Sequence, residues 1–121
     1  AAWAASWAGR APVFSNANAP VGAPSVVYNP GLGRYFLMLA HANRVDHLGV
    51  FDASEPWGPW TTVAYYSDWG NYGNREALQY GTSTKWISAD GTSVWVTYSS
   101  TGDMDSFNLV EVTLTNSTAA R

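Results

Sequence analysis

Two stretches of the chain, 25–41 and 83–100, repeat the same order of strand-like and turn-like residues. Each reads as a short strand, a glycine-containing turn and a longer aromatic strand, in "SVVYNPGLGRYFLMLAH" and "STKWISADGTSVWVTYSS". Gly33 aligns with Gly91 at a spacing of 58 residues, and Asp46 aligns with Asp105 at a spacing of 59. An internal repeat of this length predicts an architecture built from similar supersecondary units.

The periodicity predicts strands almost throughout, and no window of 11 residues has helical spacing, so the expected fold class is all-β. The expected strands are rich in Val, Tyr, Trp, Phe and Thr, the residues that favour strands. They span residues 10–15, 25–28, 35–40, 47–52, 61–67, 83–87, 94–99 and 107–115. Residues 29–34 and 89–92 carry glycines at the points where hairpins would turn.

Four short strands per unit and a period in the fifties are typical of β-propeller blades. Residues 3–16 also resemble residues 56–68, with Trp7 aligned to Trp60. A chance alignment of aromatic-rich strands is the alternative. The repeat predicts one domain of two four-stranded blades, in which residues 1–16 supply an outer strand, 23–68 form the first blade and 80–115 form the second.

The order of the strands predicts that residues 10–15 complete the last blade beside residues 107–115, which would protect its edge. Two blades cannot close a ring of four to eight, and blade faces need neighbours. We therefore expect either a homo-oligomeric ring, in which three copies give six blades, or a piece of a longer propeller chain.

Composition narrows the possible partners. The formal net charge is −3 and only 12% of the residues are charged, which argues against nucleic acid or an anionic membrane surface as a partner. The chain contains no cysteine, so it has no disulfides, and no apolar run approaches the roughly 20 residues of a membrane span. The start, "AAWAASWAG", lacks a Met and the features of a signal peptide, which suggests a removed upstream part.

The segments "APSVVYNPGLGRYFL" (23–37), "FDASEPWGPWTTV" (51–63) and "QYGTSTKWISADGTSVWVTYSS" (79–100) carry a resemblance to a known family. They resemble the C-terminal blades of secreted bacterial five-bladed β-propellers related to glycoside hydrolases, many of them of unknown function. The resemblance covers nearly all of the chain, and its most distinctive motif is Gly-Pro-Trp before the outer strand. It implies a secreted bacterial protein that acts on or binds carbohydrate.

In a propeller, the loop that joins the second strand of a blade to the third (the 2–3 loop) lies at one end of the blade. The loop that joins the fourth strand to the first strand of the next blade (the 4–1 loop) lies at the same end. Here these loops are residues 41–47, 99–106, 15–22 and 67–80, and they concentrate the polar and charged side chains. Aromatic faces and amide groups together are what a carbohydrate site requires. The expected ligand-binding residues are His41, Asn43, Arg44, His47, Trp69, Tyr72, Arg75, Tyr80 and Asp103. The alternative is that these are long solvated loops that bind no ligand, since such loops have the same composition.

Glycoside hydrolysis would need two carboxylates, one of them with a raised pKa. Glu76 is the best candidate for the acid, with Asp46 or Asp105 as its partner. The alternative, which we favour, is that Glu76 pairs with Arg75 or caps a turn, and that the aspartates make turn hydrogen bonds.

No cofactor is expected. His41 and His47 flank Asp46, but a zinc site usually has three or four ligands at recognisable spacing, so ordinary loop histidines are the better interpretation. Trp57 and Trp60 are interpreted as part of the frame of the blade, because Trp3 and Trp7 precede the same kind of strand. Two functions follow from the sequence: a carbohydrate-binding or glycoside-hydrolase-like propeller module, or a structural or protein-interaction propeller fragment.

Overall fold

A computed structural model describes residues 6–17, 21–41, 44–69, 76–101 and 106–115. As predicted, the protein is all-β: a single 3-10 turn, η1 (Trp7–Gly9), precedes the strands in the described part of the chain. The strands are β1 (Val21–Asn29), β2 (Arg34–His41), β3 (Arg44–Ala53), β4 (Thr61–Tyr66), β5 (Glu76–Ile87), β6 (Ser93–Thr101) and β7 (Ser106–Thr113). No helix among the described residues is long and apolar enough to cross a membrane.

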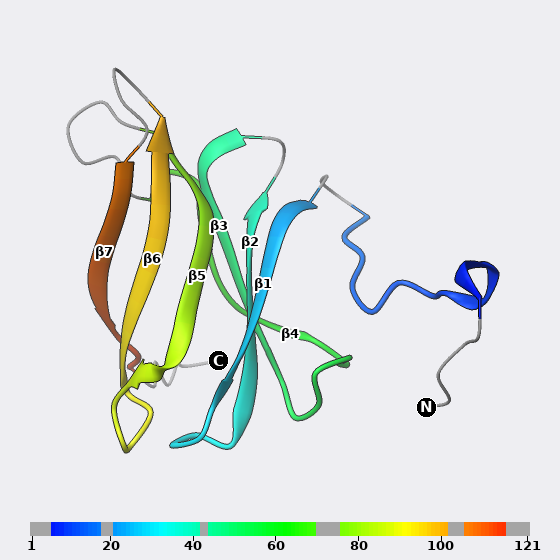
Figure 1. The fold of residues 1–121 in the computed structure, drawn as a ribbon, viewed down its shortest axis with the longest axis horizontal. Coiled ribbons are helices and arrows are strands. Elements are labelled where there is room, and N and C mark those ends of the chain that lie inside the picture. Colours follow the sequence, from blue (N-terminus) through cyan, green and yellow to red (C-terminus); the bar gives the residue numbers. More distant parts are fainter. Residues whose placement is uncertain (1–5, 18–20, 42–43, 70–75, 102–105, 116–121) are drawn as a thin grey trace, which may run out of the picture.

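The strands form two antiparallel sheets, in which each strand pairs with the next one along the chain (Figure 1). The first sheet has the order β1-β2-β3-β4, and the second has the order β5-β6-β7. Seven of the eight expected strands are therefore present, and most extend a few residues further than the sequence pattern predicted.

The prediction of a strand at residues 10–15 is wrong. These residues form no strand, and the second sheet has three strands among the described residues rather than four. Pro12 has no N–H to donate to a sheet, and the ring of Phe14 packs on Phe51 of the first sheet with the ring centroids 4.6 Å apart. This segment therefore contacts the first sheet through Phe14, and Figure 1 shows the N-terminal segment extending away from the second sheet.

The two sheets meet along β1 and β5, which run in the same direction. A Cβ on Gly81 would lie 3.3 Å from Ser25 Oγ, and three residues further along both strands Thr84 Oγ1 donates to the carbonyl of Tyr28 at 3.2 Å. The hairpin turns that follow β1 and β5 consequently lie at the same end of the molecule (Figure 1).

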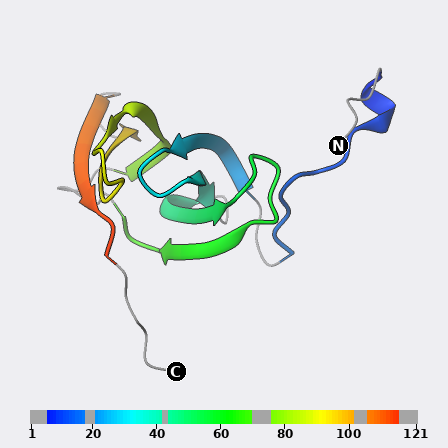
Figure 2. The same cartoon turned by 90° about the horizontal axis from the view of Figure 1, so that it is seen from below.

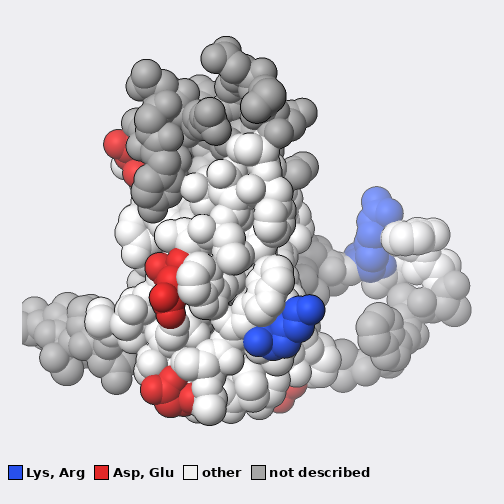
Figure 3. All heavy atoms as spheres, turned by 60° about the vertical axis from the view of Figure 1, so that its left-hand side comes forward, with Lys and Arg blue, Asp and Glu red and all other residues white. Residues whose placement is uncertain are grey.

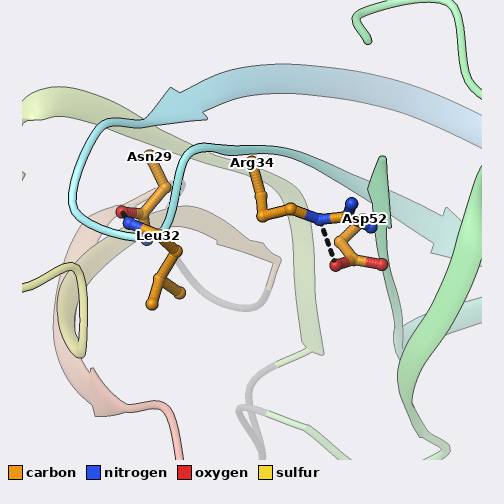
Figure 4. A network of polar contacts seen from close by, with 4 residues as sticks. All are labelled: Asn29, Leu32, Arg34 and Asp52. Atoms are coloured by element: carbon orange, nitrogen blue, oxygen red, sulfur yellow. Dashed lines mark hydrogen bonds and ion pairs between the residues drawn. The ribbon is translucent and has the colours of Figure 1, made fainter. Parts of the chain in front are cut away.

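Asn29 joins these two turns and is completely buried; Figure 4 shows it beside Leu32 of the first turn. Its Nδ2 donates to the carbonyl of Gly91 at 2.9 Å, and its Oδ1 accepts from the amide of Leu32 at 3.1 Å. Gly31 lies against the Asp90–Gly91 backbone so closely that a Cβ there would overlap it. In the second turn, Asp90 accepts hydrogen bonds from Ser88 and from Thr92.

Figure 2 shows β4 at the outer edge of the first sheet and β7 at the outer edge of the second, with β1 and β5 between them. The apolar cluster between the sheets includes Phe36 and Met38 of the first sheet and Val96 and Tyr98 of the second. Toward β4 a cavity of about 570 Å³ remains, with a mostly apolar lining that includes Tyr66 and Trp69. A second cluster lies on the other face of the first sheet: its buried residues are Leu37, Leu39 and Phe51, with Phe14 and Trp60 packed against them.

The sheet registers correct the alignment of the repeat. Tyr28 pairs with Tyr35 and Ile87 pairs with Val94, while Tyr35 also pairs with Ala53 and Val94 with Val112. All of these pairs superimpose with a single spacing of 59 residues. The Gly33–Gly91 match, at 58, is therefore displaced by one residue, and a one-residue shift exchanges the two faces of a sheet.

Candidate functional site

The strand ends that carry the expected site lie together at one end of the molecule, opposite the β1–β2 and β5–β6 turns (Figure 1). His41 ends β2, Arg44 begins β3, Glu76 begins β5 and Thr101 ends β6. Several of the expected loop residues are therefore strand residues, because β3 and β5 begin earlier than the sequence pattern predicted.

The predicted residues Asn43, Tyr72, Arg75, Asp103 and Asp105 lie outside the described residues. For Arg44, Asp46 and Glu76 the structure describes the backbone only. The expected carboxylate pair therefore stays a prediction, with Asp46 in β3 and Glu76 at the start of β5.

Tyr80 and Trp69 belong to the interior rather than to an exposed stacking surface. Tyr80 is 2% exposed, and its hydroxyl donates to the carbonyl of Ala77 at 2.9 Å. Trp69 lies edge-to-face against Tyr80 and Tyr98, at centroid distances of 5.2 and 5.3 Å, and it lines the cavity between the sheets. Tyr80 therefore lies inside the protein in this structure, and its role in ligand binding stays a prediction.

Among the predicted ligand-binding residues with described side chains, His41 lies in a polar cluster. Its Nε2 is 2.9 Å from Nδ2 of Asn16 and also makes a hydrogen bond with the Tyr65 hydroxyl, which accepts from Asn16 Nδ2 at 2.7 Å. The rings of His41 and Tyr65 are edge-to-face with centroids 4.4 Å apart. We call His41, Tyr65 and Asn16 the histidine cluster. His47, which is half-buried, lies in β3 at the same end of the first sheet.

Local packing explains how these three segments come together. Gly49 pairs with Tyr65 and Leu39 pairs with Gly49, and a Cβ on Gly49 would lie 2.9 Å from the ring of Phe51. The missing side chain at Gly49 leaves room for the Phe51 ring, on which both Phe14 and Tyr65 pack. Packing of Phe14 then places Asn16, two residues later, beside His41.

Sequence reasoning did not select Tyr65, which was expected only as an outer-strand residue. The signal that could have found it is the alternation along β4, because Tyr65 and Tyr66 must point to opposite faces of the sheet. Trp60 packs on the second cluster, in agreement with the frame role expected for it, whereas Trp57 is 53% exposed and Trp7 83% exposed.

The electrostatics of the cluster favour a neutral imidazole. Burial lowers the pKa of His41 below its usual 6.5, and the nearby His47 lowers it further. Burial raises the pKa of the Tyr65 hydroxyl, so this group stays protonated at neutral pH. No group of three His, Cys, Asp or Glu residues within the described ranges could hold a metal ion.

The lowered pKa of His41 predicts a loss of stability on acidification. A histidine whose pKa is lower in the folded state stabilises the fold above its unfolded pKa, and this contribution is lost as the pH falls toward the folded pKa. We expect the thermal midpoint to fall as the pH drops through and below 6.5. His41→Gln should reduce this dependence more than His47→Gln does, as followed by circular dichroism. An unchanged dependence in His41→Gln would assign it to other groups.

Searches of protein-family models, curated proteins and solved structures found no match to this chain.

Proposed function

We propose that the protein is a two-bladed propeller unit whose loop end binds carbohydrate, and that several copies close into a ring. The observation that carries the binding proposal is the histidine cluster, which presents an aromatic ring beside hydrogen-bonding groups of three segments. Tyr65 is 44% exposed, so part of its ring is open to a ligand. Sugars bind through ring stacking combined with hydrogen bonds of this kind.

Two features of the fold support the blade arrangement. Each sheet is an antiparallel series of neighbouring strands, and the first strands of the two sheets run side by side in the same direction. In such an arrangement the loop ends of all sheets point the same way, and a ring of copies would gather them around one opening. A glycoside-hydrolase activity would additionally require Glu76 with Asp46 or Asp105.

Adjacent tyrosines on β4 provide a matched test of sugar binding. Tyr65 and Tyr66 are 44% and 46% exposed, but Tyr66 lines the cavity on the other face. For an oligosaccharide selected on a glycan array, we expect Tyr65→Ala to weaken binding about tenfold, because a lost stacking contact is worth about 1 kcal/mol and hydrogen bonds are lost with it. Tyr66→Ala should leave the affinity unchanged in isothermal titration calorimetry. No binding on the array, or equal effects of both variants, would reject the proposed site.

The second candidate function is a structural or protein-interaction module. One observation favours it, namely the large apolar side chains exposed on the outer face of the second sheet: Trp95 is 39% exposed, Leu109 46% and Phe107 75%.

A further inference from the structure

Each of the two sheets has one face that packs against the other sheet and one face that points away from it. Phe36, Met38, Leu48 and Val50 lie on the face of the first sheet that packs against the second sheet. The opposite face of the first sheet carries Leu37, Leu39 and Phe51. On the second sheet, Val96, Tyr98 and Val110 face the first sheet, and alternation along the strands places their neighbours on the outer face.

The 59-residue spacing shows which faces correspond. It maps Phe36 onto Trp95, Leu48 onto Phe107 and Val50 onto Leu109. The face of the first sheet that is buried between the sheets therefore corresponds to the exposed outer face of the second sheet.

The same spacing maps Leu37 onto Val96, Leu39 onto Tyr98 and Phe51 onto Val110. The face of the second sheet that covers the first sheet thus corresponds to the Leu37–Leu39–Phe51 face of the first. The Leu37–Leu39–Phe51 face also carries Tyr28, which is 41% exposed. Tyr28 corresponds to Ile87, a residue packed on the cluster between the sheets.

From this correspondence we infer that the outer face of the second sheet docks on the Leu37–Leu39–Phe51 face of a second copy of this chain, head to tail. The inference rests on the blade arrangement proposed above and not on sugar binding. It repeats between copies the packing that already exists within one chain. Figure 3, viewed from the side of β7, shows a few acidic side chains on a mostly uncharged described surface. Glu111, which pairs with Trp95, lies on the docking face beside its exposed apolar side chains, and these suit an apolar interface.

Phe14 and Trp60 of the same chain already cover Leu37, Leu39 and Phe51. The second copy therefore meets the outer sides of these two aromatic residues together with the exposed part of the face on β1, where Val26 is 48% and Tyr28 41% exposed.

A head-to-tail contact uses two different surfaces, and this property defines the test. The chain should elute at a multiple of the 13.1 kDa of one copy in size-exclusion chromatography with light scattering. Leu109→Asp alters the outer face of the second sheet and Tyr28→Asp alters the facing surface of the first. Each variant alone should elute as a single copy, and the two mixed should give a dimer, since one intact pair of faces remains.

Trp57→Asp is the matched control, because Trp57 is 53% exposed in the connection between β3 and β4 and should leave the mass unchanged. Circular dichroism of each variant checks that it folds. A wild-type mass of one copy, or mixed variants that do not associate, would overturn the inference. Neither Leu109 nor Tyr28 belongs to the histidine cluster, although Tyr65 of that cluster packs on Phe51 of the docking face. Glycan binding is therefore measured for each variant as a separate test of the proposed function.

Discussion

Gly31→Ala should be among the most destabilising single substitutions in this chain, with a loss of about 3 kcal/mol in the free energy of unfolding. A Cβ at this position would overlap the Asp90–Gly91 backbone and lie 2.6 Å from the Gly91 Cα atom. Backbone atoms cannot rotate away as a side chain can, so the two hairpin turns would have to separate. Urea denaturation followed by circular dichroism measures the loss.

Alanine substitutions at two other glycines are the controls, because they separate the cost of the overlap at Gly31 from the general cost of replacing a glycine. Gly22→Ala adds the same methyl group where nothing lies within 4 Å, so its effect should stay within about 0.5 kcal/mol. Gly33 also has open space but a φ of +63°, so Gly33→Ala should show the cost of the left-handed backbone alone, about 1 kcal/mol. If Gly31→Ala proves no less stable than Gly22→Ala, the turns do not meet as described.

Asn29→Leu should lower the free energy of unfolding by about 3 kcal/mol and the thermal midpoint by about 10 °C. Leucine has a similar size, but it removes both hydrogen bonds that Asn29 makes with the Gly91 carbonyl and the Leu32 amide. The bond to the Gly91 carbonyl is buried, so no water replaces the side chain there, whereas the bond to the Leu32 amide is partly buried. The cost comes mainly from the buried Gly91 carbonyl, which is left without a donor, rather than from lost packing.

Asn16→Leu is the control for this substitution. Asn16 also donates to two side chains, His41 and Tyr65, but one bond is exposed and the other partly buried. Solvent can replace these bonds, so the expected loss is at most about 1 kcal/mol. Equal losses for Asn29→Leu and Asn16→Leu would contradict the bridging role of Asn29.

The strands could be predicted from sequence because short runs of β-branched and aromatic residues alternate with turns, and the turns need glycine at positions of positive φ. Gly33 and Gly91 both have positive φ, which most other residues avoid. The exact alignment of the repeat could not be predicted from them. Gly33 directly precedes β2, whereas Gly91 lies two residues before β6, so the same residue type occupies different places in the two turns.

The segment at residues 10–15 shows the limit of pattern alone. Its alternation suits a strand, but a strand needs a partner, and here the packing of Phe14 on Phe51 places the segment elsewhere. The residues of the candidate site could be predicted only in part, because tertiary contacts decide which side chains are buried. His41 was found because polar residues gather at strand ends, whereas the burial of Tyr80 depends on its hydrogen bond to Ala77 and on Trp69, contacts that leave no mark in the sequence.

The outer edge of β7 has a practical consequence for work with the isolated chain. Since β7 pairs with β6 on one side only among the described residues, a row of backbone N–H and C=O groups faces outward. Glu111 is the single charged residue of the strand SFNLVEVT, so little repels a strand of another molecule. Such edges template fibrous aggregation, and a lysine introduced at Leu109 or Phe107 would act as a gatekeeper during purification.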